Sequence, residues 1–357
     1  MKNHLMEYSA LVSHSRSEAL VILDRITIRH IIGQSVTNGS MVILADILHL
    51  FLNIADYGTF RKTNLPIKVH CATKSPWIDA LLFVRKQGVN LLKIDSFNTP
   101  MAFVEAGRGI LGNIDWIDIG DQISRIRAIK NREEIRRISE AVHVSEQALI
   151  GLLKRFKTGI RESHAAAILN SQLMELTGEL PFFPSIVAFG KNTAHPHWKS
   201  GSSRLEIGDT IVIDWGGCVE GYGADLTRTY FWKKASGWQL RRYRYVLDVL
   251  NILIAMLKTG IKVSEIGEKA RSLFHAKVPD ERNVFSIGHG VGLEVHELPN
   301  FAMDSQDTIM VNMVFALEPG LYIPGWGGIR LEEMVSIDLN GGRTLAEYPV
   351  EAIPVLG

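Results

Sequence analysis

The chain has 357 residues, enough for two domains, and 46% of them are hydrophobic while 22% are charged, a balance that is typical of folded globular proteins and excludes a disordered chain. Because 39 Lys and Arg residues face 38 Asp and Glu residues, there is no excess of positive charge to attract nucleic acid. The most apolar stretch, MVILADILHLFLNIA at residues 41–55, contains Asp46 and His49 and is too short to cross a membrane.

Two features predict the location of the protein. The chain has two cysteines, Cys71 and Cys218, which are too few for a disulfide framework, and free cysteines of this kind are usually buried. The opening segment MKNHLMEYSALVSHS lacks the apolar core and the cleavage site of a secretory signal. We therefore expect a reducing, cytoplasmic environment.

Residues 17–119 alternate short apolar runs, such as EALVIL and SMVILAD, with amphipathic segments such as WIDALLFVRKQG. This alternation predicts an α/β domain with a largely buried sheet. Its glycine-containing segment AGRGILGN, at residues 106–113, lacks the preceding strand that a dinucleotide-binding loop requires. This domain is therefore not expected to carry the chemistry.

A long helix is predicted to begin after Asn131, which can cap it together with Glu134. One face of this helix is apolar and consists of Ile135, Ile138, Val142, Leu149, Leu152, Leu153 and Phe156. The pattern changes near residue 125, so we place the domain boundary there, with one domain at 1–125 and the other at 126–357.

The second domain repeats one order of elements. A second helix, ESHAAAILNSQLMELTG, ends at Gly178, and strand-like segments follow through Trp232. Two further helical segments, GWQLRRYRYVLDVLNILIAMLKTG and SEIGEKARSLFHAK, precede strand-like segments that extend to the C-terminus. The domain is thus predicted to contain two halves, each with two helices followed by strands.

Two carboxylates lie in apolar, strand-forming segments of the first half. Asp214 is near the end of one such run, IVIDW, and Asp225 lies in the next, ADLTRTYFW. Aspartate is a poor strand former and is rarely buried without a positive partner. A single aspartate would most simply point into water at a strand end, whereas two in neighbouring segments favour a cation between them.

The second half contains the same kind of anomaly, because His289, Glu318 and Glu332 interrupt or border apolar runs. The five ionisable groups in interior-like positions are Asp214, Asp225, His289, Glu318 and Glu332. Together they would not stay ionised in a low-dielectric interior without neutralising cations. Four carboxylates and one imidazole suit two divalent metal ions that share bridging carboxylates.

These segments resemble the pita-bread metallopeptidases, the family that includes Xaa-Pro dipeptidase (prolidase), Xaa-Pro aminopeptidase and methionine aminopeptidase. The matching motifs are DWGG, ADLTRTY, GHGVGLEVHE, LEPGLY and GIRLEE. The resemblance extends from the N-terminal domain through residue 357. It implies a creatinase-type N-terminal α/β domain, as in the prolidase branch, and an α+β pita-bread catalytic domain with pseudo-two-fold halves.

The resemblance also implies the ligands of two divalent metal ions. Asp214 would bind one ion, and His289 and Glu318 would bind the other. Asp225 and Glu332 would bridge the two ions. Family members use Mn(II), Co(II) or Zn(II). Oxygen-rich ligation favours manganese, whereas the order of metal affinities favours zinc.

Further site residues follow from the same motifs. By resemblance, His197 in FGKNTAHPHW and His296 in VHE contact the substrate and stabilise the charge that develops, while Glu318 takes and returns a proton of water. Arg330 is predicted to share a strand face with Glu332 and to orient the carboxylates, with a simple buried ion pair as the alternative.

Two neighbours of these residues have other predicted positions. His195 has no counterpart in the family motif, so we expect a surface or packing role for it. Glu333 is predicted to point away from Glu332, either behind the metal ligands or at the surface.

The resemblance implies a homodimeric enzyme that hydrolyses the Xaa-Pro bond of dipeptides or short peptides and acts on neither nucleic acid nor membranes. In HELPN, Asn300 occupies the position where prolidases often have an arginine that meets the carboxylate of a dipeptide. An amide cannot supply that charged contact, so discrimination against longer peptides should be weak. Xaa-Pro aminopeptidase activity, hydrolysis of non-peptide amides and a catalytically silent binding domain are the alternatives.

Overall fold

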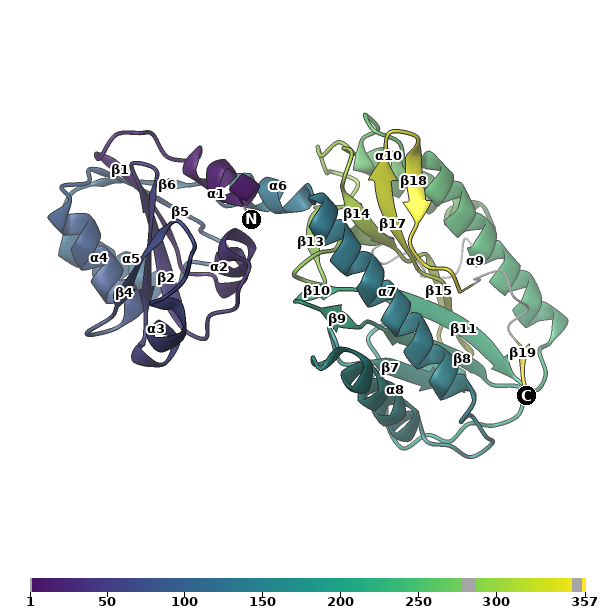
Figure 1. Ribbon diagram of the computed structural model, residues 1–357. Helices are drawn as coiled ribbons and strands as arrows, with labels where there is room; N and C mark the ends of the chain where they lie inside the picture. Colours follow the sequence, from purple (N-terminus) through teal and green to yellow (C-terminus); the bar gives the residue numbers. More distant parts are fainter. Residues whose placement is uncertain (1, 278–286, 349–354) are drawn as a thin grey trace. The chain divides into compact units, whose positions relative to one another are not determined.

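The computed structural model describes residues 2–277, 287–348 and 355–357. Its internal contacts divide the chain into two compact units, Met1–Arg127 and Ala128–Gly357, and each has its own sheets and helices (Figure 1). The division lies close to the expected boundary at residue 125. Among the described residues, every helix is too short or too polar to pass through a bilayer.

The first unit is built on a 6-stranded mixed sheet with the order β4-β3-β2-β1-β5-β6. Its strands are β1 (Glu18–Ile22), β2 (Gly39–Leu44), β3 (Ile47–Leu52), β4 (Ile67–Cys71), β5 (Leu91–Ile94) and β6 (Asp115–Asp118). Every residue of the central strand β2 is buried, which confirms the predicted buried sheet. β4 lies at an edge, and Cys71 at its end is exposed, so the expectation of a buried thiol is wrong there; Cys218 is buried.

Helices cover both faces of this sheet. They are α1 (Lys2–Ser9), α2 (Arg25–Ile32), α3 (Ile54–Phe60), α4 (Pro76–Lys86), α5 (Met101–Leu111) and α6 (Gly120–Ala128). Successive residues of a strand point to opposite faces. Accordingly, Leu20 and Ile22 of β1 pack in one core with α1 and α2. Ala19 and Val21 pack in a second core with α4 and α5.

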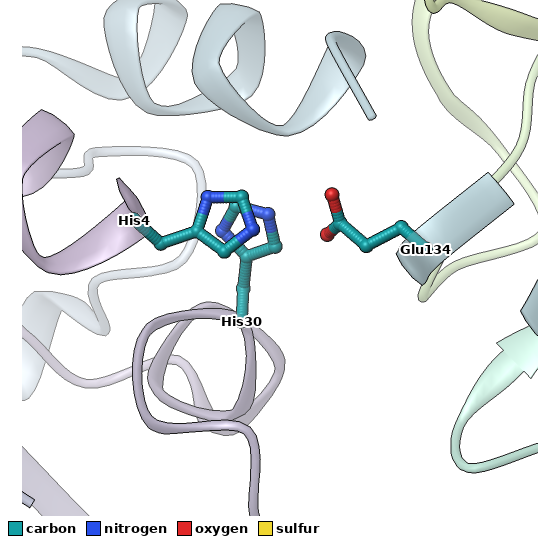
Figure 2. A group of neighbouring side chains, drawn as sticks. All are labelled: His4, His30 and Glu134. Atoms are coloured by element: carbon teal, nitrogen blue, oxygen red, sulfur yellow. The ribbon is translucent and has the colours of Figure 1, made fainter. Parts of the chain in front are cut away.

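Two histidines of the first unit lie next to each other. The ring centroids of His4 in α1 and His30 in α2 are 4.0 Å apart (Figure 2). The hydroxyl oxygen of Tyr8 lies 3.1 Å from Nδ1 of His30. These contacts tie α1 to α2. Glu134, the third side chain drawn in Figure 2, belongs to the second unit.

The second unit begins with α7 (Arg132–Leu153), and its predicted cap is confirmed. The side chain of Asn131 accepts from the backbone N–H of Glu134, whose carboxylate in turn accepts from the backbone N–H of Asn131. Four residues of the predicted apolar face are fully buried: Ile138, Val142, Leu149 and Leu152. Phe156 lies beyond the end of the helix and packs against the ring of Phe189, so its predicted place in the helix is wrong.

The predicted order of two helices followed by strands occurs twice. After α7, the first half contains α8 (Glu162–Thr177), β7 (Ile186–Phe189), the 3-10 helix η1 (Gly190–Ala194), β8 (Thr210–Trp215), β9 (Cys218–Val219), β10 (Tyr222–Gly223) and β11 (Leu226–Trp232). α8 ends at Gly178 in the left-handed conformation, as predicted.

The second half contains α9 (Gly237–Met256), α10 (Val263–Lys277), β12 (Gly288–Gly290), β13 (Glu297–Asn300), β14 (Val314–Leu317), β15 (Gly320–Ile323), β16 (Gly327–Arg330), β17 (Glu333–Asp338), β18 (Gly341–Thr344) and β19 (Val355–Leu356). Residues 285 and 286, at the start of the segment with the GHG motif, lie outside the described residues. Val249 and Leu253 of α9 and Ile266 of α10 share one apolar core with Phe315 of β14 and Val335 of β17.

The two halves meet where β11 lies beside the chain from β16 to β17. The strands of the first half form a sheet with the order β19-β11-β8-β7, to which the second half adds the edge strand β19. The second half forms a sheet with the order β13-β12-β14-β17-β18. The hydroxyl of Thr229 donates to the backbone oxygen of Arg330 at 2.7 Å, and the backbone N–H of Glu332 donates to the backbone oxygen of Thr227 at 3.1 Å. This junction places ionisable residues of both halves next to one another.

Candidate metal centre and active site

A cavity of about 990 Å³ opens in the second unit. The predicted site residues that line it are His197, Asp214, Asp225, His289, His296, Glu318 and Arg330. Glu332 lies behind this wall and is 1% exposed. Residues from β8, β12 and β16 and from the ends of β11 and β14 thus converge on one space, although more than 100 positions separate the first from the last.

Three ligand-type side chains meet at one point beside the cavity. One ligand atom from each of Asp225, His289 and Glu332 lies within 4.8 Å of the other two, and all three residues are buried. Nε2 of His289 is 3.7 Å from a carboxylate oxygen of Asp225 and 3.7 Å from one of Glu318. Two carboxylates therefore lie beside the outer nitrogen of this imidazole, and Glu332 adds a third carboxylate to the group.

The hydrogen bonding of His289 determines which of its nitrogens can bind a cation. Nδ1 lies 3.1 Å from the backbone oxygen of Gly290, which can only accept, so Nδ1 carries the proton. Burial lowers the pKa of His289 to about 4, so the ring is neutral at pH 7. Nε2 then directs its lone pair toward the carboxylates, which is repulsive unless a cation lies between them. The contact of Nδ1–H with a backbone oxygen is the one that a metal-binding histidine usually makes through its other nitrogen.

Asp214 is held by Arg330. The guanidinium donates through Nη2 to Oδ2 of Asp214, and both side chains are largely buried. The other carboxylate oxygen, Oδ1, is buried and has no hydrogen-bond partner among the described residues. A buried carboxylate oxygen without a donor is costly, and a bound cation would satisfy it.

A buried threonine connects the arginine to the carboxylate cluster. Nε of Arg330 donates to the hydroxyl of Thr227 at 3.0 Å, and that hydroxyl donates to Glu332 at 2.7 Å. Nη1 of Arg330 also donates to the hydroxyl oxygen of Tyr322 at 2.9 Å. These contacts fix the directions of the Arg330 and Glu332 side chains.

The electrostatics of the cluster also require added positive charge. Burial raises the pKa of Asp214, Asp225, Glu318 and Glu332. Repulsion between neighbouring carboxylates adds to this effect, and the charge of Arg330 opposes it. The pKa of Glu318 rises to about 7. One guanidinium is thus insufficient to keep four carboxylates ionised, whereas divalent cations would do so, and the residues present fit such ions.

The two histidines assigned to substrate contact lie at the same cavity. The ring of His296 is 4.3 Å from that of His289, centroid to centroid, in an edge-to-face arrangement. His197 is exposed to the cavity and follows η1. His195 does not line the cavity; its ring stacks on that of Trp198 with centroids 5.4 Å apart.

Residues 136–338, more than half of the chain, match the model of metallopeptidase family M24. The chain belongs to metallopeptidase family M24. It is 30% identical to the Xaa-Pro dipeptidase of Pyrococcus horikoshii over 339 residues, which cover 94% of each chain.

Solved structures of M24 peptidases have the same fold. The chain is similar to the prolidase from Pyrococcus horikoshii, with a TM-score of 0.91 and 28% identity over 98% of this chain and 100% of that one. It is also similar to the X-Pro aminopeptidase from Thermotoga maritima, with a TM-score of 0.86 and 27% identity over 95% and 97%. The predicted combination of an N-terminal α/β domain and a pita-bread catalytic domain is confirmed.

The structure also places three other predicted residues of this M24 site. The side chains of Arg330 and Glu332 both contact the hydroxyl of Thr227 and so point to the same side, as expected, although β16 ends at Arg330 and β17 begins at Glu333. Glu333 is buried and pairs with Arg228 at 2.8 Å, so of its two predicted positions the buried one is correct. Asn300 is exposed, does not line the cavity, and its side-chain oxygen accepts from the backbone N–H of Ala302 at 3.3 Å.

Thr227 and Tyr322 are parts of the M24 site that the sequence analysis missed. Thr227 could have been found, because it lies two residues after Asp225 and alternate residues of a strand share a face. Tyr322 gave no comparable signal, since its contact with Arg330 depends on the pairing of β15 with β16.

Proposed function

We propose that this M24 peptidase is a dinuclear metal-dependent enzyme that hydrolyses the Xaa-Pro bond of dipeptides and short peptides. The observation that carries the proposal is the convergence of Asp225, His289 and Glu332 on one buried point at the wall of a cavity. Relatives of similar length that are named Xaa-Pro dipeptidase and X-Pro aminopeptidase support the choice of bond.

In this proposal, Asp214, Asp225, His289, Glu318 and Glu332 would together hold two divalent metal ions. Divalent cations held there would act as Lewis acids toward a peptide carbonyl and would lower the pKa of a water molecule. Mn(II), Co(II) and Zn(II) are the candidates. Four oxygen-bearing ligands favour Mn(II) on the ground of ligand type.

The chain's own side chains would bind the peptide and move protons. His197 and His296 line the cavity, where each can donate to an oxygen that becomes negative as the carbonyl is attacked. Glu318 lines the same cavity, where its carboxylate can take a proton from water and return it. Phe183 and Val295 give the cavity an apolar wall for a proline ring.

Dipeptidase activity is the leading assignment, and Xaa-Pro aminopeptidase activity is the alternative. Asn300 is an exposed amide outside the cavity lining, so it supplies no charged contact that would require the carboxylate of a dipeptide. We expect kcat/KM for an Xaa-Pro-Xaa tripeptide to lie within about tenfold of that for Xaa-Pro. A dipeptide preference of about a thousandfold or more, which is equivalent to about 4 kcal/mol, would contradict this expectation. The homodimer and the cytoplasmic location stay predictions.

The deciding experiment measures metal content and peptidase activity together. Protein stripped with a chelator should be inactive toward Met-Pro, and Mn(II), Co(II) or Zn(II) should restore turnover as about two ions bind per chain. Met-Ala serves as the control peptide and should be a much poorer substrate. Less than one bound ion per chain, with no restored activity, would favour a catalytically silent binding domain. Restored hydrolysis of a non-peptide amide, but not of Met-Pro, would favour a hydrolase of non-peptide amides.

A further inference from the structure

A buried carboxylate lies behind the segment that carries His197. Glu162, the first residue of α8, is 0% exposed. Its Oε1 accepts from the backbone N–H of Phe189 at 2.8 Å and from Nδ2 of Asn192 at 2.8 Å. Its Oε2 accepts from the indole N–H of Trp198 at 2.9 Å and from the backbone N–H of Gly201 at 3.0 Å. Both oxygens are therefore saturated by donors.

All four donors belong to residues 189–201, which comprise the last residue of β7 and the segment that follows it toward β8. Phe189 and Asn192 precede His197, and Trp198 and Gly201 follow it. One side chain thus holds the segment on both sides of the histidine. Among the described residues, no cation pairs with Glu162, so N–H donors alone compensate its charge, and hydrogen bonds to an ionised group are stronger than neutral ones.

His197 itself has no comparable anchor. Its imidazole makes no hydrogen bond to the part of the chain that the structure describes, although it lines the cavity. The position of its ring therefore follows from the path of its backbone. Because the hydrogen bonds to Glu162 fix that path, the carboxylate controls where the histidine stands.

We propose that Glu162 is a positioning residue that holds His197 at the cavity for its contact with substrate. The proposal rests on the proposed function, because the contact of His197 with a peptide belongs to it. Glu162 itself does not line the cavity and is not a metal-binding residue, so it acts on turnover through the segment that it holds. In that segment His197 is the residue assigned to the reacting carbonyl, so an effect on kcat is expected to pass through His197.

The test is Glu162→Gln, which keeps the volume of the side chain. One oxygen becomes an NH2 group that faces two N–H donors, so half of the hydrogen bonds are lost. A displacement of about 1 Å at a reacting group costs about a hundredfold in rate, so we expect kcat to fall by roughly 10- to 100-fold at unchanged metal content. In a His197→Ala background, the same substitution should lower kcat by less than twofold.

Glu146→Gln is the matched control. Glu146 is a buried carboxylate of α7 whose oxygen accepts from the backbone N–H groups of Glu347 and Tyr348, away from residues 189–201. Glu146→Gln should change kcat by the same factor in the wild-type protein and in the His197→Ala variant. If Glu162→Gln also lowers kcat by the same factor in both backgrounds, Glu162 is a stabilising residue only and the positioning role is wrong.

A readout that does not depend on activity keeps this proposal separate from the proposed function. The indole N–H signal of Trp198 and the amide exchange of residues 189–201 report the hydrogen bonds to Glu162 directly. Glu162→Gln should shift the signal and speed the exchange, and unchanged values would overturn the proposal. If the wild-type protein, loaded with metal, cleaves no Xaa-Pro peptide while these changes occur, the proposed function fails and the structural role of Glu162 stands.

A different observation supports a second inference, on the recognition of substrate. Lys199 lines the cavity and is exposed, and its ammonium group has no hydrogen bond or ion pair among the described residues. The other lysine or arginine in the lining is Arg330, whose donors are used by Asp214, Thr227 and Tyr322. Of the lysine and arginine side chains in the described lining, Lys199 is therefore the one whose charge is available to a carboxylate that enters the cavity.

We infer that Lys199 binds the free carboxylate of a short peptide, which also rests on the proposed function. Lys199→Met should lower kcat/KM for Met-Pro by about fivefold, the upper range for an exposed ion pair, and should change that for Met-Pro amide by less than twofold. Lys191→Met is the control, because Lys191 is an exposed lysine of η1 outside the cavity lining, and it should change neither value.

An equal effect of Lys199→Met on the acid and the amide, or no effect on either, would refute the role of Lys199. Lys199→Arg should keep the preference for the acid, since the charge is retained. Failure of the wild-type enzyme to cleave either peptide would instead count against the proposed function.

Discussion

Replacement of Thr227 by valine isolates the link between Arg330 and the carboxylate cluster. The hydroxyl is fully buried, accepts from Nε of Arg330 at 3.0 Å and donates to Glu332 at 2.7 Å. Valine has the same shape, so Thr227→Val leaves the Nε–H of Arg330 and a carboxylate oxygen of Glu332 buried without this partner. Each loss costs about 1–3 kcal/mol, while the added methyl group contributes about 1 kcal/mol of stability. We expect the free energy of unfolding to fall by about 3 kcal/mol.

Metal binding should weaken as well, because Thr227 orients Glu332. Loss of a partner that orients a metal ligand typically lowers metal affinity by about 10- to 100-fold. Thr229→Val is the matched control: its hydroxyl is also buried in β11 but contacts the backbone oxygen and N–H of Arg330 at 2.7 and 3.1 Å. This control should lose similar stability and keep its metal affinity.

The assay combines urea unfolding of metal-free protein with competition for Mn(II) against a chelator. Thr227→Val should lower both the free energy of unfolding and the affinity for Mn(II). Thr229→Val should lower only the free energy of unfolding. Wild-type Mn(II) affinity in Thr227→Val, or an equal loss of affinity in both variants, would show that the hydroxyl does not orient Glu332 as a metal ligand.

Three further predictions concern the ligands, the catalytic histidines and the N-terminal unit. Asp225→Asn should abolish peptidase activity and remove most of the rise in Tm that metal gives the wild-type protein; a retained rise and retained turnover would disprove the ligand assignment. His197→Ala and His296→Ala should each lower kcat by roughly 100- to 1000-fold with normal metal content, and loss of metal in either would place that histidine among the ligands. Burial, followed by the charges of His70 and Lys68, lowers the pKa of His49 from 6.5 to about 4. The unfolded chain therefore binds this proton more readily, so the contribution to stability is complete above pH 6.5 and is lost as the pH falls toward 4, by at most about 3 kcal/mol. In His49→Phe, the free energy of unfolding, measured with urea, should depend less on pH between these values. An unchanged pH dependence would refute the assignment to His49.

Local patterns in the sequence determined the order of the elements and the identity of the ionisable groups. The cap at Asn131 and the helix end at Gly178 depend on residues a few positions apart, so they could be predicted directly. Asp214, Asp225 and Glu332 were conspicuous because they stand among apolar residues, and their chemical types already indicated a cationic partner.

The tertiary structure alone decided which of these groups meet and what holds them. Arg330 reaches Asp214 across 116 positions of the chain, and the carboxylate of Glu162 reaches Gly201 across 39. Asn300 was expected from its motif position to face the substrate, and yet it lies outside the cavity lining. Such contacts depend on the register of strand pairs and on the directions of side chains, and a shift of one residue in register turns every side chain of a strand to the other face.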